Sequence, residues 1–265
     1  MKTHRRFALV LLAALAVFAI VGPWIAPDRS IPGEFILQAP SRAHWLGTDG
    51  VARDIFARLA FGARISLIVA LIAVTVAAAV GSMVGLLAGA TDTLIARVAQ
   101  RVINLGLALP RVIVLLVVLA TIGEISIVTL GVVLGMTGWP AVARLVRGET
   151  LRLRETQFVV AARALGAPPS HIIWRDIFPG TLPAVLVATT LGVADAILLE
   201  AGLSFIGVGV RPPEASWGGM ILEAREYIYN APWLLIAPCV ALVVATSAAT
   251  LLGEALRRSL QPDTR

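Results

Sequence analysis

Two acidic residues, Asp195 and Glu200, follow an apolar segment whose residues 177–194 carry no charge. Charged groups inside a membrane are costly, and they usually face a water-filled cavity or a partner group. Positions 195 and 200 lie about 140° apart around an α-helix, so we expect their side chains on different faces. We expect the Asp195 side chain to face such a cavity or partner, and the Glu200 side chain to pair with a basic residue such as Arg211. A buried structural pair or hydrogen bond would explain either residue equally well.

The other side chains that could do chemistry exclude several classes of function. Lys2 is the only lysine, and a phosphate-binding P-loop needs a lysine after its glycines, so any ATPase must be another chain. Cys239 and the three histidines, His4, His44 and His171, lack the spacing of metal ligands. No histidine lies inside an apolar run, and no serine–histidine or paired-aspartate arrangement occurs at matching depth, which disfavours an intramembrane enzyme. We expect no catalytic residue, metal or cofactor in this chain, and Cys239 is interpreted as a packing residue.

These residues belong to a strongly apolar chain. Of its 265 residues, 58% are hydrophobic and 14% are charged, and the mean hydropathy is +0.88. A bilayer core takes about 20 apolar residues as a helix, whereas the strands of a membrane barrel would alternate apolar and polar residues. The runs do not alternate, so the sequence predicts an all-α polytopic membrane protein with six transmembrane helices. The third helix must start near Val102 and contain Pro110 and Arg111 in or near its first half.

The basic residues predict the topology of these helices. With the N-terminus inside, 14 basic residues fall in cytoplasmic segments and 7 in outer segments, so both termini are expected in the cytoplasm. The net charge of +6 is then mostly a topology signal, since the basic residues are too dispersed for a nucleic-acid site. The first apolar run is longer than a usual signal-peptide core, so we expect a retained helix rather than a cleaved signal.

The helices and the segments between them divide the chain into four parts. The 65–256 part includes a cytoplasmic loop at 147–180, and the segment before it is expected to end in a helix lying at the outer interface. The parts are an N-terminal transmembrane helix at 1–26, an extracytoplasmic segment at 27–64, a five-helix core at 65–256 and a cytoplasmic tail at 257–265.

Small residues recur in the second apolar run. Gly81, Gly85 and Gly89 form a small-xxx-small pattern, which lets helices approach closely within one bundle or between two chains. No internal repeat is convincing, which disfavours a secondary transporter built from two inverted halves.

The cytoplasmic loop has the most informative pattern. Residues 156–165 are compatible with a helix, Gly166 is a good C-terminal stop, and the Pro168–Pro169 pair forces a turn. Ser170 fits the N-cap of a second short helix that ends before Pro179. The first helix would either rest on the membrane or insert into the groove of a partner. Its expected exposed surface consists of Phe158, Val159, Ala161, Ala162 and Leu165.

Several motifs in order resemble one family of membrane proteins. Ala161–Ala162, Gly166 and Ile177–Pro179 are similar to the "EAA" loop of the permease subunits of bacterial ABC importers. Val160 stands where that loop often has an acidic residue, so an ionic contact expected there is in doubt. The resemblance to the dipeptide, oligopeptide and nickel permeases, and to their C-type member in particular, extends through His44–Asp49, Arg53–Asp54, Gly62–Leu67, Ala108–Pro110, Gly202–Gly209, Pro212–Pro213 and Trp217–Gly218.

This resemblance implies a type I ABC importer (MetI-like) permease fold in the bacterial inner membrane. It also implies a heterodimer with a homologous second permease, two ATPase subunits that bind ATP and Mg²⁺, and an extracytoplasmic solute-binding protein. Contacts are implied with membrane lipid and not with nucleic acid. The cytoplasmic loop would transmit the motion of the ATPases to the membrane helices by alternating access.

The resemblance also assigns residues to these contacts. Asp195, with Glu200 as a second candidate, is expected to line the translocation pathway. Asp49, Glu214 and Trp217 are candidates for contact with the binding protein. Loop closure alone would explain the glycines and prolines of the 203–219 segment equally well. The residues implied in coupling to the ATPases are Gln157, Phe158, Val159, Ala161, Ala162, Arg163, Leu165, Gly166 and Ala167.

The cargo of such an importer stays open at this level. Short peptides are the default for the group, and nickel, a glutathione-like solute or another small solute are alternatives. A different class, an ion-coupled secondary transporter, would use Asp195 and Glu200 as proton or cation sites.

Overall fold

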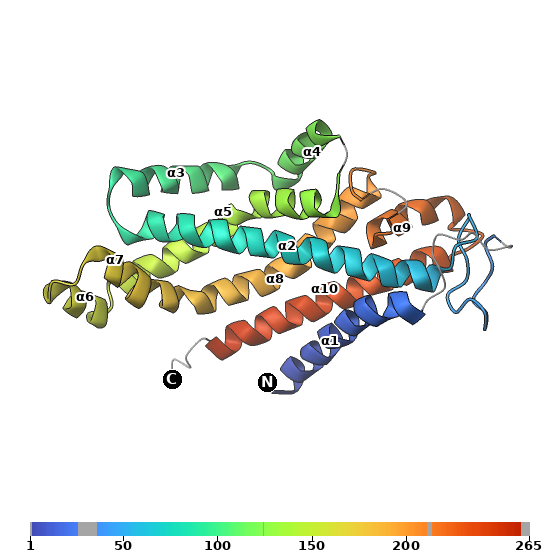
Figure 1. The fold of residues 1–265 in the computed structure, drawn as a ribbon, viewed down its shortest axis with the longest axis horizontal. Helices are drawn as coiled ribbons and strands as arrows, with labels where there is room; N and C mark the ends of the chain where they lie inside the picture. Colours follow the sequence, from blue (N-terminus) through green and yellow to red (C-terminus); the bar gives the residue numbers. More distant parts are fainter. Residues whose placement is uncertain (1, 26–35, 124, 211–213, 261–265) are drawn as a thin grey trace.

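The computed structural model describes residues 2–25, 36–123, 125–210 and 214–260, and this part of the chain is helical without a β-strand. Figure 1 shows the long helices side by side in one bundle. The α6–α7 hairpin forms one end, the hairpin end, and residues 36–54 with α9 form the opposite end, the cap end. The helices, including the π-helix η1 and the 3₁₀ helix η2, are α1 (Lys2–Ile25), α2 (Ile55–Ala90), α3 (Leu94–Ala108), α4 (Arg111–Ile122), α5 (Ile127–Arg154), α6 (Gln157–Ala164), α7 (Pro169–His171), η1 (Ile172–Ile177), α8 (Phe178–Phe205), α9 (Trp217–Ala224), η2 (Arg225–Tyr227) and α10 (Trp233–Leu260).

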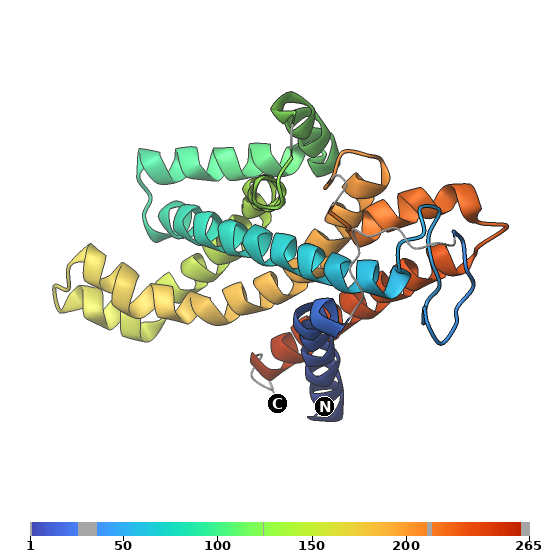
Figure 2. The ribbon, with the colours of Figure 1, turned by 45° about the vertical axis from the view of Figure 1, so that its right-hand side comes forward.

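Four helices are long and apolar enough to cross a membrane: α2, α5, the unit Pro169–Phe205 that ends with α8, and α10. α3 and α4 pass the same test only as a pair that is bent by 89°. α1 contributes a shorter apolar helix, Leu9–Ile25. The structure therefore has four or five spans by length and composition, plus α1, where the sequence predicted six. The start of α1 and the end of α10 lie near each other in both views (Figure 1, Figure 2).

α2 begins earlier than the predicted second span. Asp54 is its N-cap and accepts a hydrogen bond from the backbone N–H of Ala57 at 2.9 Å, and the helix then runs from Ile55 to Ala90 as one element. The prediction of a separate interfacial helix before position 65 is wrong. Ile55 and Ala63 are 0% exposed and belong to the core, so this first part of α2 packs within the bundle.

α2 and α5 approach closely because glycines lie on both helices. A Cβ atom on Gly85 of α2 would lie 2.6 Å from the carbonyl oxygen of Ala143, and one on Gly135 of α5 would lie 2.6 Å from Cβ of Val76. Gly81 is equally close to α5. These glycines therefore pack within this one chain, one of the two arrangements that the small-xxx-small pattern allowed.

Proline 110 divides the predicted third span. Leu109, the residue before it, is extended, with φ −83° and ψ 134°, because the proline ring disfavours the helical conformation of its predecessor. α3 therefore ends at Ala108 and lies beside α2, while α4 starts at Arg111 and turns away by 89° (Figure 2). The bend puts the Arg111 side chain at the surface of α5.

Candidate coupling and translocation site

α6 protrudes at the hairpin end with a defined exit. The chain leaves α6 at Gly166, whose φ of +83° lies in the left-handed region that favours glycine. The N–H of Ala167 donates to the carbonyl of Ala162 at 3.1 Å, and the N–H of Gly166 donates to that of Arg163 at 3.0 Å. Together these two bonds form a Schellman motif, so the predicted helix stop at Gly166 is confirmed.

One face of α6 is buried against the bundle and the other is exposed. Val159 is 0% exposed and packs with Val146, Leu153 and Ile177. The prediction that Val159 is exposed for a partner is therefore wrong, because its side chain anchors the hairpin to α5 and η1. Leu165 is 88% exposed. Of the other predicted coupling residues, Gln157, Phe158, Ala161, Arg163 and Gly166 are exposed, and Ala162 and Ala167 are half-buried.

The second arm of the hairpin differs from the prediction. Pro168, not Ser170, is the N-cap of α7, and the chain continues through η1 into α8 without ending before Pro179. The prediction of a separate short helix is wrong. In the π turn the N–H of Phe178 donates to the carbonyl of Ile173, five residues back, and the helix continues past Pro179 although proline supplies no N–H. The hairpin is therefore a direct extension of α8.

Two arginines tie the hairpin end of α5 to the end of α2. Arg154 donates to the carbonyl of Gly89 at 3.0 Å and to Oδ2 of Asp92 at 2.8 Å, and Arg147 donates to the carbonyl of Ala88 at 3.3 Å. The last carbonyls of a helix have no intrahelical partner, so these bonds satisfy the end of α2. The hydrogen bond from Arg154 lowers the pKa of Asp92 below its ordinary value of 3.8.

A groove runs along α5 and α8 from the hairpin end into the bundle. Its wide part has a volume of about 800 Å³, with Arg144 and Arg257 in its wall. A smaller cavity of about 170 Å³ lies further in, between α2, α5 and α8. Ala141 and Ala188 line both cavities, so the two lie next to each other, with Asp195 in the wall of the smaller one.

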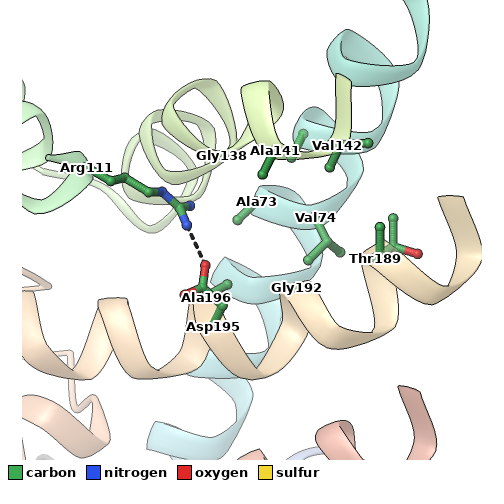
Figure 3. A pocket seen from close by; sticks show the side chains of 12 residues that line it. Ala73, Val74, Arg111, Gly138, Ala141, Val142, Thr189, Gly192, Asp195 and Ala196 are labelled. Carbon is green, nitrogen blue, oxygen red and sulfur yellow. Dashed lines mark hydrogen bonds and ion pairs between the residues drawn. The ribbon is translucent and has the colours of Figure 1, made fainter. Parts of the chain in front are cut away.

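The inner cavity contains an ion pair between α4 and α8. Arg111 reaches from α4 toward α8, and its Nη1 donates to Oδ2 of Asp195 (Figure 3). The same guanidinium donates to the carbonyl of Leu134 at 2.9 Å and to Oγ1 of Thr137 at 3.4 Å. Asp195 therefore lines a cavity, while its role in a pathway stays a prediction. Sequence reasoning left Arg111 in the membrane without a role, and Pro110 was the available signal that its helix is broken.

Glu200 is enclosed in the bundle and takes no part in the groove. Its side chain is 0% exposed, and it accepts hydrogen bonds from the hydroxyls of Ser66 at 2.8 Å and Ser204 at 2.9 Å. The hydrogen-bonded interpretation is therefore confirmed, while the expected partner Arg211 lies outside the described residues. In the described part of the chain, no three His, Cys, Asp or Glu side chains gather closely enough to hold a metal ion.

A buried ionic cluster closes the cap end. Oδ2 of Asp49 accepts from Nε of Arg53 and from Nη1 of Arg58, both at 2.7 Å. Both arginines also bind Glu223 next to them on α9. Asp49 is 2% exposed, so its side chain holds the outer segment to α2 and α9.

Trp217 lies inside the same end of the bundle. It is 0% exposed, and its Nε1 donates to the carbonyl of Leu59 at 3.1 Å. Asp49 and Trp217 were both predicted to contact a binding protein, and in this structure neither side chain reaches the surface. Glu214, the third predicted contact, is half-buried.

Comparison with known proteins gives one consistent family. The family described as the binding-protein-dependent transport system inner membrane component matches residues 81–265. A putative peptide permease protein of Brucella suis is 41% identical, over 97% of this chain and 86% of the relative. A dipeptide transport system permease protein of Bacillus subtilis is 34% identical, over 97% and 81%, and a glutathione transport system permease protein of Escherichia coli is 36% identical, over 96% and 85%.

A solved structure has the same fold. It is titled as inward-facing conformations of the MetNI methionine ABC transporter, and the two chains superpose with a TM-score of 0.65 at 22% identity. The match covers 77% of this chain and 97% of the other. This agrees with the type I, MetI-like fold that the sequence motifs implied.

Proposed function

Because the chain belongs to the family of inner membrane components of binding-protein-dependent transport systems, we propose that it forms half of the translocation pathway of an importer for short peptides. It is a multi-pass, non-catalytic permease subunit, and ATP hydrolysis in such systems lies in partner subunits. The other half would be a homologous second permease. Two ATPase subunits that bind ATP and Mg²⁺, and an extracytoplasmic binding protein, would complete the importer.

The observation on which this function rests is the shape of α6. Its exposed side presents Phe158 and Leu165, while Val159 holds it to α5 and η1 and the Schellman motif fixes its exit. An exposed apolar helix that is fixed to the bundle suits insertion into the groove of another protein. We place this hairpin in the cytoplasm, in contact with an ATPase subunit.

The connection between hairpin and groove supports transmission of motion. α7 and η1 run directly into α8, and α8 forms one wall of both cavities. A push on α6 would therefore move the wall that contains Asp195, as rocking of a rigid element in alternating access requires. The groove is wider toward the hairpin end, where a solute would leave for the cytoplasm.

The name of the cargo rests on relatives and not on this chain's own side chains. The relatives from Brucella suis and Bacillus subtilis are named for peptides and dipeptides, which supports short peptides. The Escherichia coli relative is named for glutathione, itself a short peptide, so glutathione is the second candidate. Nickel has no three-residue ligand cluster among the described residues, and an ion-coupled secondary transporter does not fit this family.

Contact with the binding protein would use the surface of the cap end. Since Asp49 and Trp217 are buried, we assign them to the support of that surface. Trp45 and Tyr229, which are 61% and 98% exposed, lie there, and the half-buried Glu214 stays a predicted contact.

Crosslinking in the assembled importer tests the proposal. In a Cys239→Ala background, Ala161→Cys on the exposed side of α6 should crosslink to an ATPase subunit, and the crosslink should block ATP-driven uptake of dialanine into proteoliposomes. Val243→Cys is the matched control, because Val243 is 63% exposed on α10, away from the hairpin, and should give no such crosslink. Uptake that continues while the cysteine at 161 finds no ATPase would overturn the coupling role.

A further inference from the structure

The ion pair at the inner end of the groove has no part in the coupling described above. Arg111 and Asp195 are the two charged residues among the described residues that line the inner cavity. We propose that they bind the charged ends of a zwitterionic solute, Arg111 taking a carboxylate and Asp195 an ammonium group. This inference deepens the proposed function and rests on it, because a short peptide with free ends has both groups.

Two groups on α5 hold the Arg111 guanidinium in place independently of Asp195. The carbonyl of Leu134 accepts from Nη2 at 2.9 Å, and Oγ1 of Thr137 accepts from Nε at 3.4 Å. Gly138 leaves the space that the guanidinium occupies, since a Cβ there would lie 2.8 Å from Nη2. A guanidinium has five N–H donors, so a fixed Arg111 can present its remaining donors to a carboxylate in the cavity.

The Asp195 carboxylate has fewer hydrogen-bond partners than the Arg111 guanidinium. Arg111 is its one hydrogen-bond or ion-pair partner within the described part of the chain, and its side chain is 57% exposed. A structural ion pair at membrane depth would be expected to satisfy both oxygens of its carboxylate from the protein. Asp195 faces the cavity beside Arg111 (Figure 3). Its carboxylate can therefore accept a hydrogen bond from the ammonium group of a solute in that cavity.

An exchange of partners explains why such a pair suits a zwitterion. Separating two opposite charges in a weakly polar site is costly unless each charge finds a new partner. A solute with both a carboxylate and an ammonium group offers both replacements at once, and the carboxylate can bind the guanidinium through two parallel hydrogen bonds. A solute with one blocked end would leave Arg111 or Asp195 without a partner.

The surrounding walls leave room for the rest of the solute. The lining near the pair is small, with Ala73 and Ala77 from α2 and Gly192 from α8. The cavity of about 170 Å³ shares Ala141 and Ala188 in its lining with the neighbouring one of about 800 Å³. The charged ends would thus be held at the pair while side chains extend into the wider groove.

The test measures binding to the purified transporter complex in nanodiscs, without the binding protein, by ligand-detected NMR. The probes are dialanine, N-acetyl-dialanine and dialaninamide, which have both charged ends, only the carboxylate, and only the ammonium group. The wild-type complex should bind dialanine at least about tenfold more tightly than either blocked form, which corresponds to about 1.4 kcal/mol.

Single substitutions then distinguish recognition of the solute from a purely structural ion pair. Asp195→Asn should abolish the preference for a free amino group and keep the preference for a free carboxylate, and Arg111→Gln should do the reverse. If the ion pair only holds α4 to α8, each substitution should change the binding of all three probes by the same factor, and that result would overturn the inference. Asp92→Asn, which removes an exposed carboxylate outside both cavities, is the matched control and should leave both preferences unchanged.

A second measurement leaves Arg111 and Asp195 unchanged, so it does not require that variants of these two residues assemble into the transporter complex. Thr189→Cys, in a Cys239→Ala background, places a thiol in the inner cavity for modification by neutral methyl methanethiosulfonate. Dialanine should slow this modification, and dialaninamide at the same concentration should slow it much less. Equal protection by both probes, or none, would refute the site. If the crosslink from position 161 is present at the same time, only this inference fails and the proposed function stands.

Discussion

Replacement of Gly85 by alanine should destabilise the bundle through the contact between α2 and α5. The added Cβ would lie 2.6 Å from the carbonyl oxygen of Ala143 and 2.8 Å from Cβ of Val146. The backbone oxygen cannot rotate away as a flexible side chain could, so the two helices must separate locally. Overpacking of this kind costs about 1–3 kcal/mol, and at about 2–4 °C per kcal/mol the melting temperature should fall by about 2–12 °C.

Thermal unfolding of the purified protein in detergent, followed by tryptophan fluorescence, measures this effect. Gly202→Ala is the matched control, because Gly202 is also in a helix and a Cβ there would have no atom within 4 Å. Alanine has the higher helix propensity, so the control should leave stability unchanged or raise it by about 1 kcal/mol. Equal melting temperatures for the two variants would refute the view that glycines set the distance between α2 and α5.

Three further outcomes follow from the structure. Val159→Ala should lower the stability by about 1–3 kcal/mol, since it empties a buried site, whereas Leu165→Ala should leave the melting temperature unchanged and reduce ATP-driven uptake; a stability loss for both would contradict the two faces of α6. Arg58→Met should destabilise the cap end by about 1–3 kcal/mol, because the buried Asp49 carboxylate loses one of its two arginine partners and keeps Arg53, and hydrogen exchange of residues 36–54 should rise with α10 unchanged. The carboxyl of Asp92 should stay ionised until the pH falls below 3.8, because Arg154 lowers its pKa. The contact between Asp92 and Arg154 is then present above pH 3.8 and is lost only as the pH drops through the lowered pKa. Carbon-13 NMR of the Asp92 carboxyl can follow this loss.

The membrane class, the helical fold and the position of the hairpin could be predicted from sequence because each follows from local chemistry. Long uncharged runs leave a membrane helix as the only way to satisfy the backbone, so composition alone decided the class. Gly166 ended α6 where expected, because a left-handed residue at a helix C-terminus depends on a few neighbouring atoms. The predictions that failed concern residues whose burial depends on which helices pack against them.

Val159 and the helix start at Ile55 show that difference. Both are apolar residues at positions where a sequence allows either a membrane surface or a core, and both proved to be 0% exposed. In the same way, a π turn let the chain pass Pro179 without ending the helix, which local rules alone did not indicate.

The candidate site shows most clearly what each level decides. The sequence by itself placed two acidic residues, Asp195 and Glu200, at membrane depth and a proline before Arg111, since these are local facts of residue type and order. Only the tertiary structure joined Asp195 to Arg111, because the bend of 89° and the close packing of α2 on α5 bring together residues that are 84 positions apart. Charge pairing depends on distance in space, and distances between remote segments are set by the packing of whole helices and not by any short stretch of sequence.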